Sequence, residues 1–203
     1  MRSAVILKSS VQRLASTALP WWRSTRLPFP CARICWREHR SAAVGFPLGQ
    51  STPKVKKYET VDAIANGADE IDYVINITQL KEKNYDFIEH EMAGIVEECR
   101  SAGVISKVIF ENCYLTEEEK RALCSIAREV RPDFIKTSTG FGTGGATFED
   151  VALMKKCVGD EVKIKAAGGI RTLDTALRMI ELGVSRIGST ASVSIVEELK
   201  HRL

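Results

Sequence analysis

The chain of 203 residues contains few histidines and no long hydrophobic run. Its three histidines, His39, His90 and His201, lie away from the ends of the apolar segments that predict strands. Their positions argue against a Ser-His-Asp hydrolase and against a catalytic metal centre built from histidine. No uninterrupted apolar run approaches the roughly 18 residues that a membrane-spanning helix requires, so we expect no membrane segment.

Disulfide-rich and nucleic-acid-binding classes are also disfavoured. The 6 cysteines are scattered, and several fall in or beside predicted helices and strands, which is typical of reduced thiols in an intracellular protein. Residues 41–203 carry 21 Lys/Arg and 25 Asp/Glu, a mildly acidic balance that does not indicate general affinity for nucleic acid. With 44% hydrophobic residues, the chain can bury a substantial core in one or two domains.

The sequence divides into an atypical basic N-terminal segment, residues 1–41, and a globular domain, residues 42–203. The first 40 residues contain eight Lys/Arg, a single acidic residue (Glu38) and all three tryptophans. An Arg-rich, Ser-containing and acid-poor segment is typical of a mitochondrial transit peptide. A disordered basic arm, and a product of altered splicing or a shifted reading frame, are the alternatives. We predict a cytoplasmic location, or a mitochondrial one if residues 1–40 act as a transit peptide.

From residue 42 on, predicted strands and helices alternate. After a short apolar run at 42–49, strands begin near residues 70, 107, 133, 162 and 185, which are 23–37 residues apart. That spacing is the length of one βα unit, and nearly continuous apolar strands indicate a parallel sheet covered on both faces. Periodicity alone allows an open doubly wound sheet or a (β/α)8 barrel that lacks two units.

Helices are expected at 54–66, 84–102, 116–128, 147–158, 172–182 and from the last strand to about 200. In the first of these, Val55, Tyr58 and Val61 recur at helical spacing. Thr116 and Glu119 form the sequence pattern of a capping box at the start of the third helix.

Two lysines stand near the ends of consecutive predicted strands, Lys136 in DFIKTST and Lys165 in VKIKAAG. Burial disfavours the charged form of an ammonium group. Two lysines one βα unit apart would lie on neighbouring strands, where each raises the cost of protonating the other. This arrangement favours a lysine that is neutral and nucleophilic near pH 7, as Schiff-base chemistry requires.

Further polar residues stand where these strands end, at the edge of a parallel α/β fold that normally carries function. Asp72 interrupts an apolar strand, so it must be paired with a cation or hydrogen-bonded. It could relay protons among the lysines, or form a structural salt bridge to one of them. The other polar residues at strand ends are Glu111, Thr137, Ser138, Thr139 and Ser189.

Two glycine-containing loops have the features of a phosphate site. Gly168 and Gly169 precede one predicted helix, and Gly188, Ser189 and Thr190 precede the last one. Free backbone N–H groups at two such helix starts could bind a phosphate group. The glycine-rich segment 140–146 has the wrong spacing for a dinucleotide-binding loop, and we expect a flexible lid or loop there.

Several segments resemble the deoxyribose-phosphate aldolases, class I aldolases that reversibly split 2-deoxy-D-ribose 5-phosphate into D-glyceraldehyde 3-phosphate and acetaldehyde. They occur in the family's order and spacing, and DFIKTSTGF with a downstream KAAGGIRT is highly specific. The similar segments are VGFPLGQST (44–52), NGADEIDYVIN (66–76), KVIFENCYLTEEEK (107–120), DFIKTSTGF (133–141), KAAGGIRT (165–172) and RIGSTASVSIVEEL (186–199).

The resemblance implies a TIM-type (β/α)8 barrel in which strands three to eight are recognisable. It implies a lyase that needs neither a metal nor an organic cofactor. Lys136 matches the Schiff-base lysine, Lys165 matches the second lysine, which makes the first easier to deprotonate and transfers protons, and Asp72 matches the acid of the proton relay. The residues then expected to bind substrate or its phosphate are Thr139, Gly168, Gly169, Gly188, Ser189 and Thr190.

The resemblance also implies a small phosphorylated sugar as the partner, with no nucleic acid or membrane, and makes the chain a candidate homo-oligomer. The chain departs from the family pattern at two places. Asn112 stands where threonine is common, and residues 1–40 do not resemble the first two βα units. A barrel without those units has exposed edges at strands three and eight. The alternative to an active aldolase is a catalytically impaired barrel fragment, or a non-catalytic interaction protein derived from this family.

Overall fold

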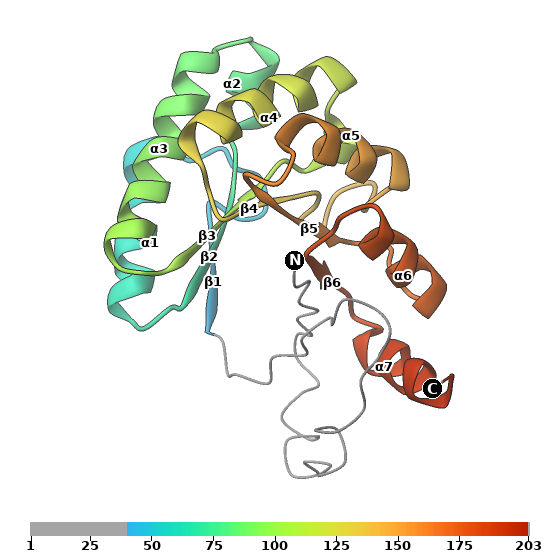
Figure 1. Ribbon diagram of the computed structural model, residues 1–203. Helices are drawn as coiled ribbons and strands as arrows, with labels where there is room; N and C mark the ends of the chain where they lie inside the picture. The colour runs from blue at the N-terminus through green and yellow to red at the C-terminus, as the bar shows by residue number, and fades with distance from the viewer. Residues whose placement is uncertain (1–39, 203) are drawn as a thin grey trace.

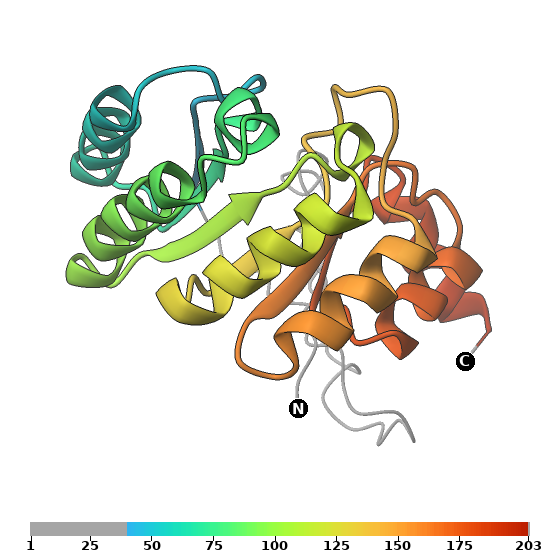
Figure 2. The ribbon, with the colours of Figure 1, turned by 90° about the horizontal axis from the view of Figure 1, so that it is seen from above.

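The computed structural model describes residues 40–202, which form a curled sheet of six parallel strands with helices on its outer side (Figures 1 and 2). The strands follow chain order from β1 to β6, and each is hydrogen-bonded to the next. Within the described residues, β1 and β6 therefore have a strand neighbour on one side only. The predicted incomplete TIM-type barrel is confirmed, and the open doubly wound sheet is not the architecture. Residues 1–39, to which the transit-peptide and basic-arm predictions refer, lie outside the described residues.

The strands and helices lie close to the predicted ranges. The strands are β1 (Ser41–Val44), β2 (Glu70–Val74), β3 (Ile105–Ile109), β4 (Phe134–Lys136), β5 (Lys163–Ala167) and β6 (Arg186–Gly188). The helices are α1 (Pro53–Ala65), α2 (Ile77–Lys81), α3 (Tyr85–Ser101), α4 (Glu117–Val130), α5 (Phe148–Val158), α6 (Leu173–Glu181) and α7 (Ser192–His201), with a short 3₁₀ helix, η3 (Asn112–Tyr114), before α4. The short helix α2 was not predicted. No described helix has both the length and the apolar content needed to cross a membrane.

Side-chain caps fix where the helices begin. The capping box of α4 is confirmed: Thr116 Oγ1 accepts a hydrogen bond from Glu119 N, and Glu119 Oε2 accepts one from Thr116 N at 2.7 Å. Thr147 and Thr172 accept hydrogen bonds from the first turns of α5 and α6 in the same way. Each of these caps follows a strand and its loop, so it fixes the path of the chain from the end of that strand into the next helix.

Alternation along the strands separates an apolar outer face from a charged inner face. In β2, Ile71 and Tyr73 are fully buried and belong to the core between sheet and helices. Glu70 and Asp72, which alternate with them, point to the other face and are 2% exposed each. The inner face of the curled sheet is thus where buried charges meet.

Helix α1 forms where predicted, but its apolar stripe is not its buried side. Val55, Tyr58 and Val61 are 49%, 73% and 45% exposed, whereas Lys56 and Thr60 are fully buried. Helical spacing locates a helix, but which side is covered depends on its neighbours. Here α1 packs against α3 and β1, and this packing turns Lys56 inward.

Candidate active site

Charged side chains from five neighbouring strands meet on the inner face of the sheet. The strand register places Asp72 beside Lys107, and Lys136 beside Lys165. Lys165 is in turn the register partner of Arg186 on β6. The predicted proximity of Asp72, Lys136 and Lys165 is therefore observed, and it follows directly from the parallel register.

One carboxylate holds three lysines. Lys136 Nζ and Lys165 Nζ both donate to Oδ2 of Asp72, at 2.8 Å and 2.7 Å. Lys107 Nζ donates to the other oxygen, Oδ1, at 2.5 Å. The Asp72 side chain is 3% exposed, while those of Lys136 and Lys165 are 9% and 11% exposed. Only the two lysines named from the sequence retain a small exposed surface through which a substrate could reach them.

A second layer of ion pairs lies behind this one, and the sequence did not reveal it. Glu70 accepts from Lys107 at 2.8 Å, and both of its oxygens accept from Arg186 Nη1 at 2.8 Å. Glu70 lies on β2 and Arg186 on β6, so their contact spans the interior of the curled sheet. Arg186 Cζ also stacks 4.7 Å from the ring centroid of Phe134.

Burial and the shared carboxylate set the ionisation of this cluster. Burial lowers the pKa of Lys165 to about 7, against the attraction of Asp72 and with the help of the neighbouring ammonium groups of Lys136 and Lys107. Burial alone would raise the pKa of Asp72, but the ammonium groups of Lys165, Lys136 and Lys107 outweigh it and hold that pKa well below its usual range. Asp72 is thus a fixed anion, and Lys165 can exchange a proton at neutral pH.

Glu111 organises the rim of the site beyond β3. Its backbone lies in the left-handed region (φ 46°), which is unfavourable for a residue with a side chain and shows that its position is held by its contacts. Its carboxylate accepts hydrogen bonds from Thr139 N at 3.2 Å and from Thr139 Oγ1. Thr139, predicted to bind substrate, is thereby held at the end of β4. The Cys113 thiol lies 3.8 Å from the same carboxylate.

The glycine-rich loop 140–146 packs closely over this rim. A Cβ at Gly142 would meet Cys113 Sγ at 2.7 Å, and one at Gly145 would meet Gly168 O at 2.4 Å. Ala146 N donates to Ala167 O and Gly168 O, which fixes the end of the loop to β5. Phe141, 77% exposed, makes an edge-to-face contact with Phe46 at 5.4 Å between centroids. The loop is therefore packed on the rim along most of its length, and a flexible lid there stays a prediction.

The two predicted phosphate loops lie at the same sheet edge, after β5 and β6. Gly168 and Gly169 have φ of 85° and 78°, a conformation that glycine adopts without strain. Ser189 Oγ donates to Ile170 O at 2.5 Å, which joins the two loops. Among the described residues, neither Gly169 N nor Thr190 N has a hydrogen-bond acceptor. The loops are therefore adjacent and retain main-chain donors.

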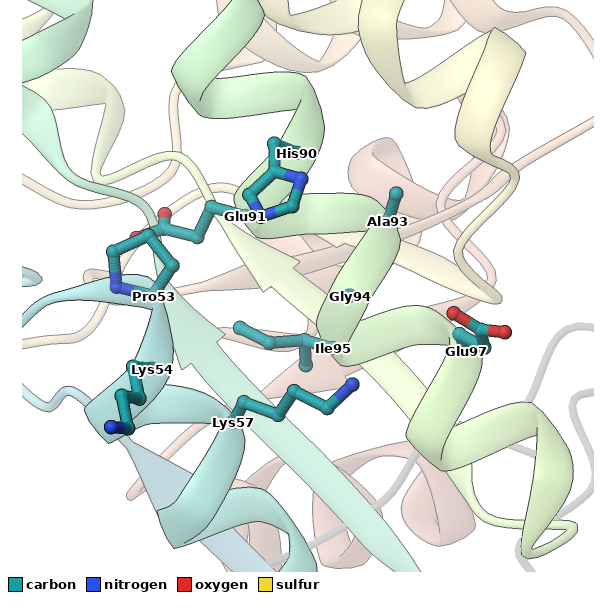
Figure 3. Close-up of a pocket in the computed structure, with 9 residues that line it drawn as sticks. All are labelled: Pro53, Lys54, Lys57, His90, Glu91, Ala93, Gly94, Ile95 and Glu97. Atoms are coloured by element: carbon teal, nitrogen blue, oxygen red, sulfur yellow. The ribbon is translucent and has the colours of Figure 1, made fainter.

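A surface groove between α1 and α3 is distinct from the lysine site (Figure 3). It lies on the outer side of the sheet, and none of the predicted site residues lines it. Lys57 beside it is paired with Glu98 at 2.8 Å. The residues that line the groove are Pro53, Lys54, Lys57, His90, Glu91, Ala93, Gly94, Ile95 and Glu97.

The class of protein follows from the fold and the inner site together. Two adjacent buried lysines, one with a pKa near 7, at the strand ends of a parallel barrel define the site of a lysine-dependent class I aldolase. Comparison with protein families matches residues 42–189 to the DeoC/LacD family aldolases. The chain belongs to this family.

Individual relatives agree with this assignment. The chain is 60% identical over 162 residues to the deoxyribose-phosphate aldolase of Lactobacillus acidophilus, an alignment that covers 80% of this chain and 68% of the relative. It is 54% identical over 157 residues to that of Thermococcus kodakarensis, covering 77% and 70%. The chain thus spans roughly two thirds of the length of these relatives.

Solved structures show the same architecture. A structure titled "QR15, an Aldolase" aligns with a TM-score of 0.76 at 43% identity, covering 81% of this chain and 73% of the other. A deoxyribose phosphate aldolase from Aeropyrum pernix, described as having a unique tetrameric structure, aligns with a TM-score of 0.73 at 29% identity, covering 81% and 69%. The resemblance found in the sequence is confirmed.

Proposed function

We propose that this chain is a deoxyribose-phosphate aldolase that reversibly cleaves 2-deoxy-D-ribose 5-phosphate to D-glyceraldehyde 3-phosphate and acetaldehyde. The observation that carries the proposal is the sharing of Asp72 Oδ2 by Lys136 and Lys165 inside the barrel. A lone buried lysine with a carboxylate is an ordinary structural ion pair. Two lysines on one oxygen carry a surplus positive charge, which favours a neutral amine.

The proposed nucleophile is Lys136. Its amine attacks C1 of the open-chain aldehyde, and loss of water gives a protonated imine. The C3 hydroxyl then gives up its proton, the C2–C3 bond breaks, and its electron pair moves to the iminium as an enamine. D-Glyceraldehyde 3-phosphate leaves; protonation of the enamine at C2 and hydrolysis of the imine release acetaldehyde and restore the amine. The imine is the electron sink, so no metal or organic cofactor is needed.

Lys165 and Asp72 have separate parts in this proposal. Lys165, with a pKa of about 7, can accept a proton and return it within one turnover at neutral pH. Asp72 has a pKa held well below its usual range, so it contributes as an ionised acceptor that aligns the two amines. Its part in the proton relay is then to position the lysines between which protons move.

The adjacent loops after β5 and β6 are the proposed phosphate site. Gly168, Gly169, Gly188, Ser189 and Thr190 would surround the phosphate with main-chain N–H groups near the starts of α6 and α7. The partner is then a small phosphorylated sugar and not a nucleic acid or a membrane. By analogy with the tetrameric relative from Aeropyrum pernix, we also propose a homo-oligomer. A cytoplasmic location remains a prediction, which imaging a fluorescent fusion of residues 1–40 would test.

The test is a coupled assay for release of D-glyceraldehyde 3-phosphate from 2-deoxy-D-ribose 5-phosphate by the full chain. We expect activity in the parent and none in Lys136→Ala. Lys156→Ala, at an exposed lysine on α5, is the matched control and should retain parental activity. A parent that is folded but inactive would instead favour the impaired barrel fragment or interaction protein, which the single-sided pairing of β1 and β6 keeps as the second candidate.

A further inference from the structure

Lys107 is buried more completely than either of the two proposed reactive lysines. Its side chain is 0% exposed, against 9% for Lys136 and 11% for Lys165. A buried ion pair contributes little net stability, because desolvating the charges offsets their attraction. Stability alone therefore does not explain a third lysine at the centre of this site.

Lys107 binds one oxygen of the Asp72 carboxylate, and the two proposed reactive lysines bind the other. Lys107 Nζ binds Oδ1 at 2.5 Å, and the Ser41 hydroxyl lies 3.5 Å from the same oxygen. Oδ2 is left to Lys136 and Lys165, which both bind it. Two ammonium groups on one oxygen are closer together, and repel each other more, than two groups on separate oxygens.

The other contact of Lys107 keeps it in this place. Glu70 accepts from Lys107 at 2.8 Å and is itself held by Arg186 from β6, with Nη1 at 2.8 Å from both of its oxygens. Arg186, Glu70, Lys107 and Asp72 thus form a continuous row of ion pairs across the interior. The row ends at the oxygen opposite the one that the reactive lysines share.

We propose that Lys107 is a positioning residue: it occupies Oδ1 of Asp72, confines Lys136 and Lys165 to Oδ2, and disfavours the state in which both are protonated. The part of Lys107 in catalysis rests on the proposed aldolase function, but its effect on the ionisation of Lys165 can be measured without catalysis. Lys107 itself touches no reacting atom in this proposal.

The charge balance of the whole cluster agrees with this role. Among residues 40–202, four cationic side chains face two carboxylates, so these groups carry two excess positive charges when every lysine is protonated. Release of the Lys165 proton relieves part of that excess, and burial, Lys136 and Lys107 lower the pKa of Lys165 to about 7 against the attraction of Asp72. Within the described part of the chain, the groups on the six strands that face Asp72 or its partners are the Ser41 hydroxyl, Glu70, Lys107, Lys136, Lys165 and Arg186.

A matched control exists on the outer side of the sheet. Lys56 on α1 is also 0% exposed, and its Nζ donates to Glu91 Oε1 at 2.7 Å and to Val74 O at 2.8 Å. There one lysine faces one carboxylate across α1 and α3, outside the cluster around Asp72. Lys56→Gln therefore removes a buried lysine charge of the same kind without changing the inner row.

The experiment follows the ionisation of Lys165 in the full chain by NMR of ¹³Cε-labelled lysine, with the signal assigned through Lys165→Arg. The proteins compared are the parent, Lys107→Gln, Lys107→Arg and Lys56→Gln. Glutamine keeps a donor for Asp72 and removes the charge. We expect a midpoint near the Lys165 pKa of about 7 in the parent, an upward shift of about 1 pH unit in Lys107→Gln, and no shift in the other two.

An unchanged midpoint in Lys107→Gln, or an equal shift in Lys56→Gln, would overturn the inference. Unfolding of Lys107→Gln while Lys56→Gln stays folded would also overturn it, since Lys107 would then be structural. Borohydride trapping with acetaldehyde, run on the same proteins across pH, separates the two proposals. A parent that forms no imine overturns the aldolase function, whereas a parent that forms one with a pH dependence unaltered in Lys107→Gln overturns only the role of Lys107.

Discussion

The middle strands of the sheet and its two end strands differ in how many of their backbone hydrogen-bonding groups are paired with a neighbouring strand. Strands β2 to β5 have a neighbour on both sides, and they carry Asp72, Lys107, Lys136 and Lys165, all of which are buried. Strands β1 and β6 have one neighbour each within the described residues. Beside β1, helix α1 exposes Tyr58 and Val55, whereas β6 is tied to β2 through the Arg186–Glu70 ion pair.

Because of this difference, we expect the catalytic groups and the groups that limit stability to lie mainly in different parts of the sheet. The reactive lysines and their carboxylate stand on strands with a neighbour on both sides, and the end strands add Arg186, which holds Glu70, and the Ser41 hydroxyl. The edges of β1 and β6 that have no strand neighbour within residues 40–202, and the exposed stripe of α1, affect association and the free energy of unfolding. Substitutions of the lysines and Asp72 should therefore change activity most, and changes along the outer edges of β1 and β6 should mainly change stability and oligomeric state.

The largest effect is expected from Lys136→Arg in the middle of the sheet. Arginine keeps the positive charge and much of the bulk but stays protonated, so it cannot attack a carbonyl. Retro-aldol activity should fall by a factor on the order of 10⁴ or more, as when a covalent nucleophile is removed. Circular dichroism should show a nearly unchanged fold. Parental activity in this variant would place the nucleophile elsewhere.

Lys165→Leu should slow the reaction by a factor on the order of 10² at pH 7, since it removes a proton-transfer group. Because Lys165 titrates with a pKa of about 7, the change of rate with pH that this group causes near neutrality should disappear in the variant. Rates measured from pH 6 to 10 check this. A profile with the parental shape and position would mean that Lys165 takes no part in proton transfer.

Asp72→Asn leaves three buried lysines without their shared counter-charge. Removing one partner of a buried ion pair typically costs about 3–5 kcal/mol, so urea denaturation should show a loss of that order. Glu91→Gln on the outer face is the comparison, because the Glu91 carboxylate is paired with a single lysine, Lys56. A smaller loss of unfolding free energy in Asp72→Asn than in Glu91→Gln would contradict an excess of positive charge in the inner cluster.

The ends of the sheet are tested by placing two βα units of family sequence ahead of residue 42. New strands beside β1 and β6 should pair the edges that have no neighbour among the described strands, and raise the stability by a few kcal/mol, or ~10 °C in Tm. Light scattering should show less association of the kind that open edges promote. An unchanged Tm would mean that the edges are already covered, and activity that rises only with the added units would make the ends part of the site.

Lys165 also makes the stability of the chain depend on pH. The folded chain releases this proton near a pKa of about 7, and the unfolded chain near 10.5, so unfolding takes up a proton between these values. The stability of the parent relative to Lys165→Leu should therefore rise as pH increases from about 7 to 10.5. Taking this difference cancels contributions common to both proteins, such as the buried thiol Cys99, whose pKa burial raises to about 12.

Much of this middle region was predictable from the sequence, for a physical reason. Parallel strands place their carboxyl ends at one edge, so Lys136 and Lys165, each near the end of an apolar strand, had to become neighbours. The capping box of Thr116 and Glu119 was equally visible, because all of its interactions are local. The family segments supplied the barrel, which the periodicity had left open.

The contacts that were missed are non-local. Glu70 and Arg186 are 116 residues apart, and each stands at the first position of its strand, where a charge is usually exposed. The spacing of Glu70 and Asp72 by two residues was the available indication that both face inward. The buried face of α1 was unpredictable for a similar reason, since Lys56 is turned inward by Glu91, 35 residues away.

The most direct test of the central claim is to locate the imine. The full chain is incubated with acetaldehyde, reduced with borohydride, digested, and its peptides are identified by mass spectrometry. The account predicts a reduced adduct on Lys136 in the parent and no adduct there in Lys136→Arg. An adduct mainly on Lys165, or no adduct on a folded chain, would contradict the assignment of the paired lysines on Asp72 as the centre of an aldolase.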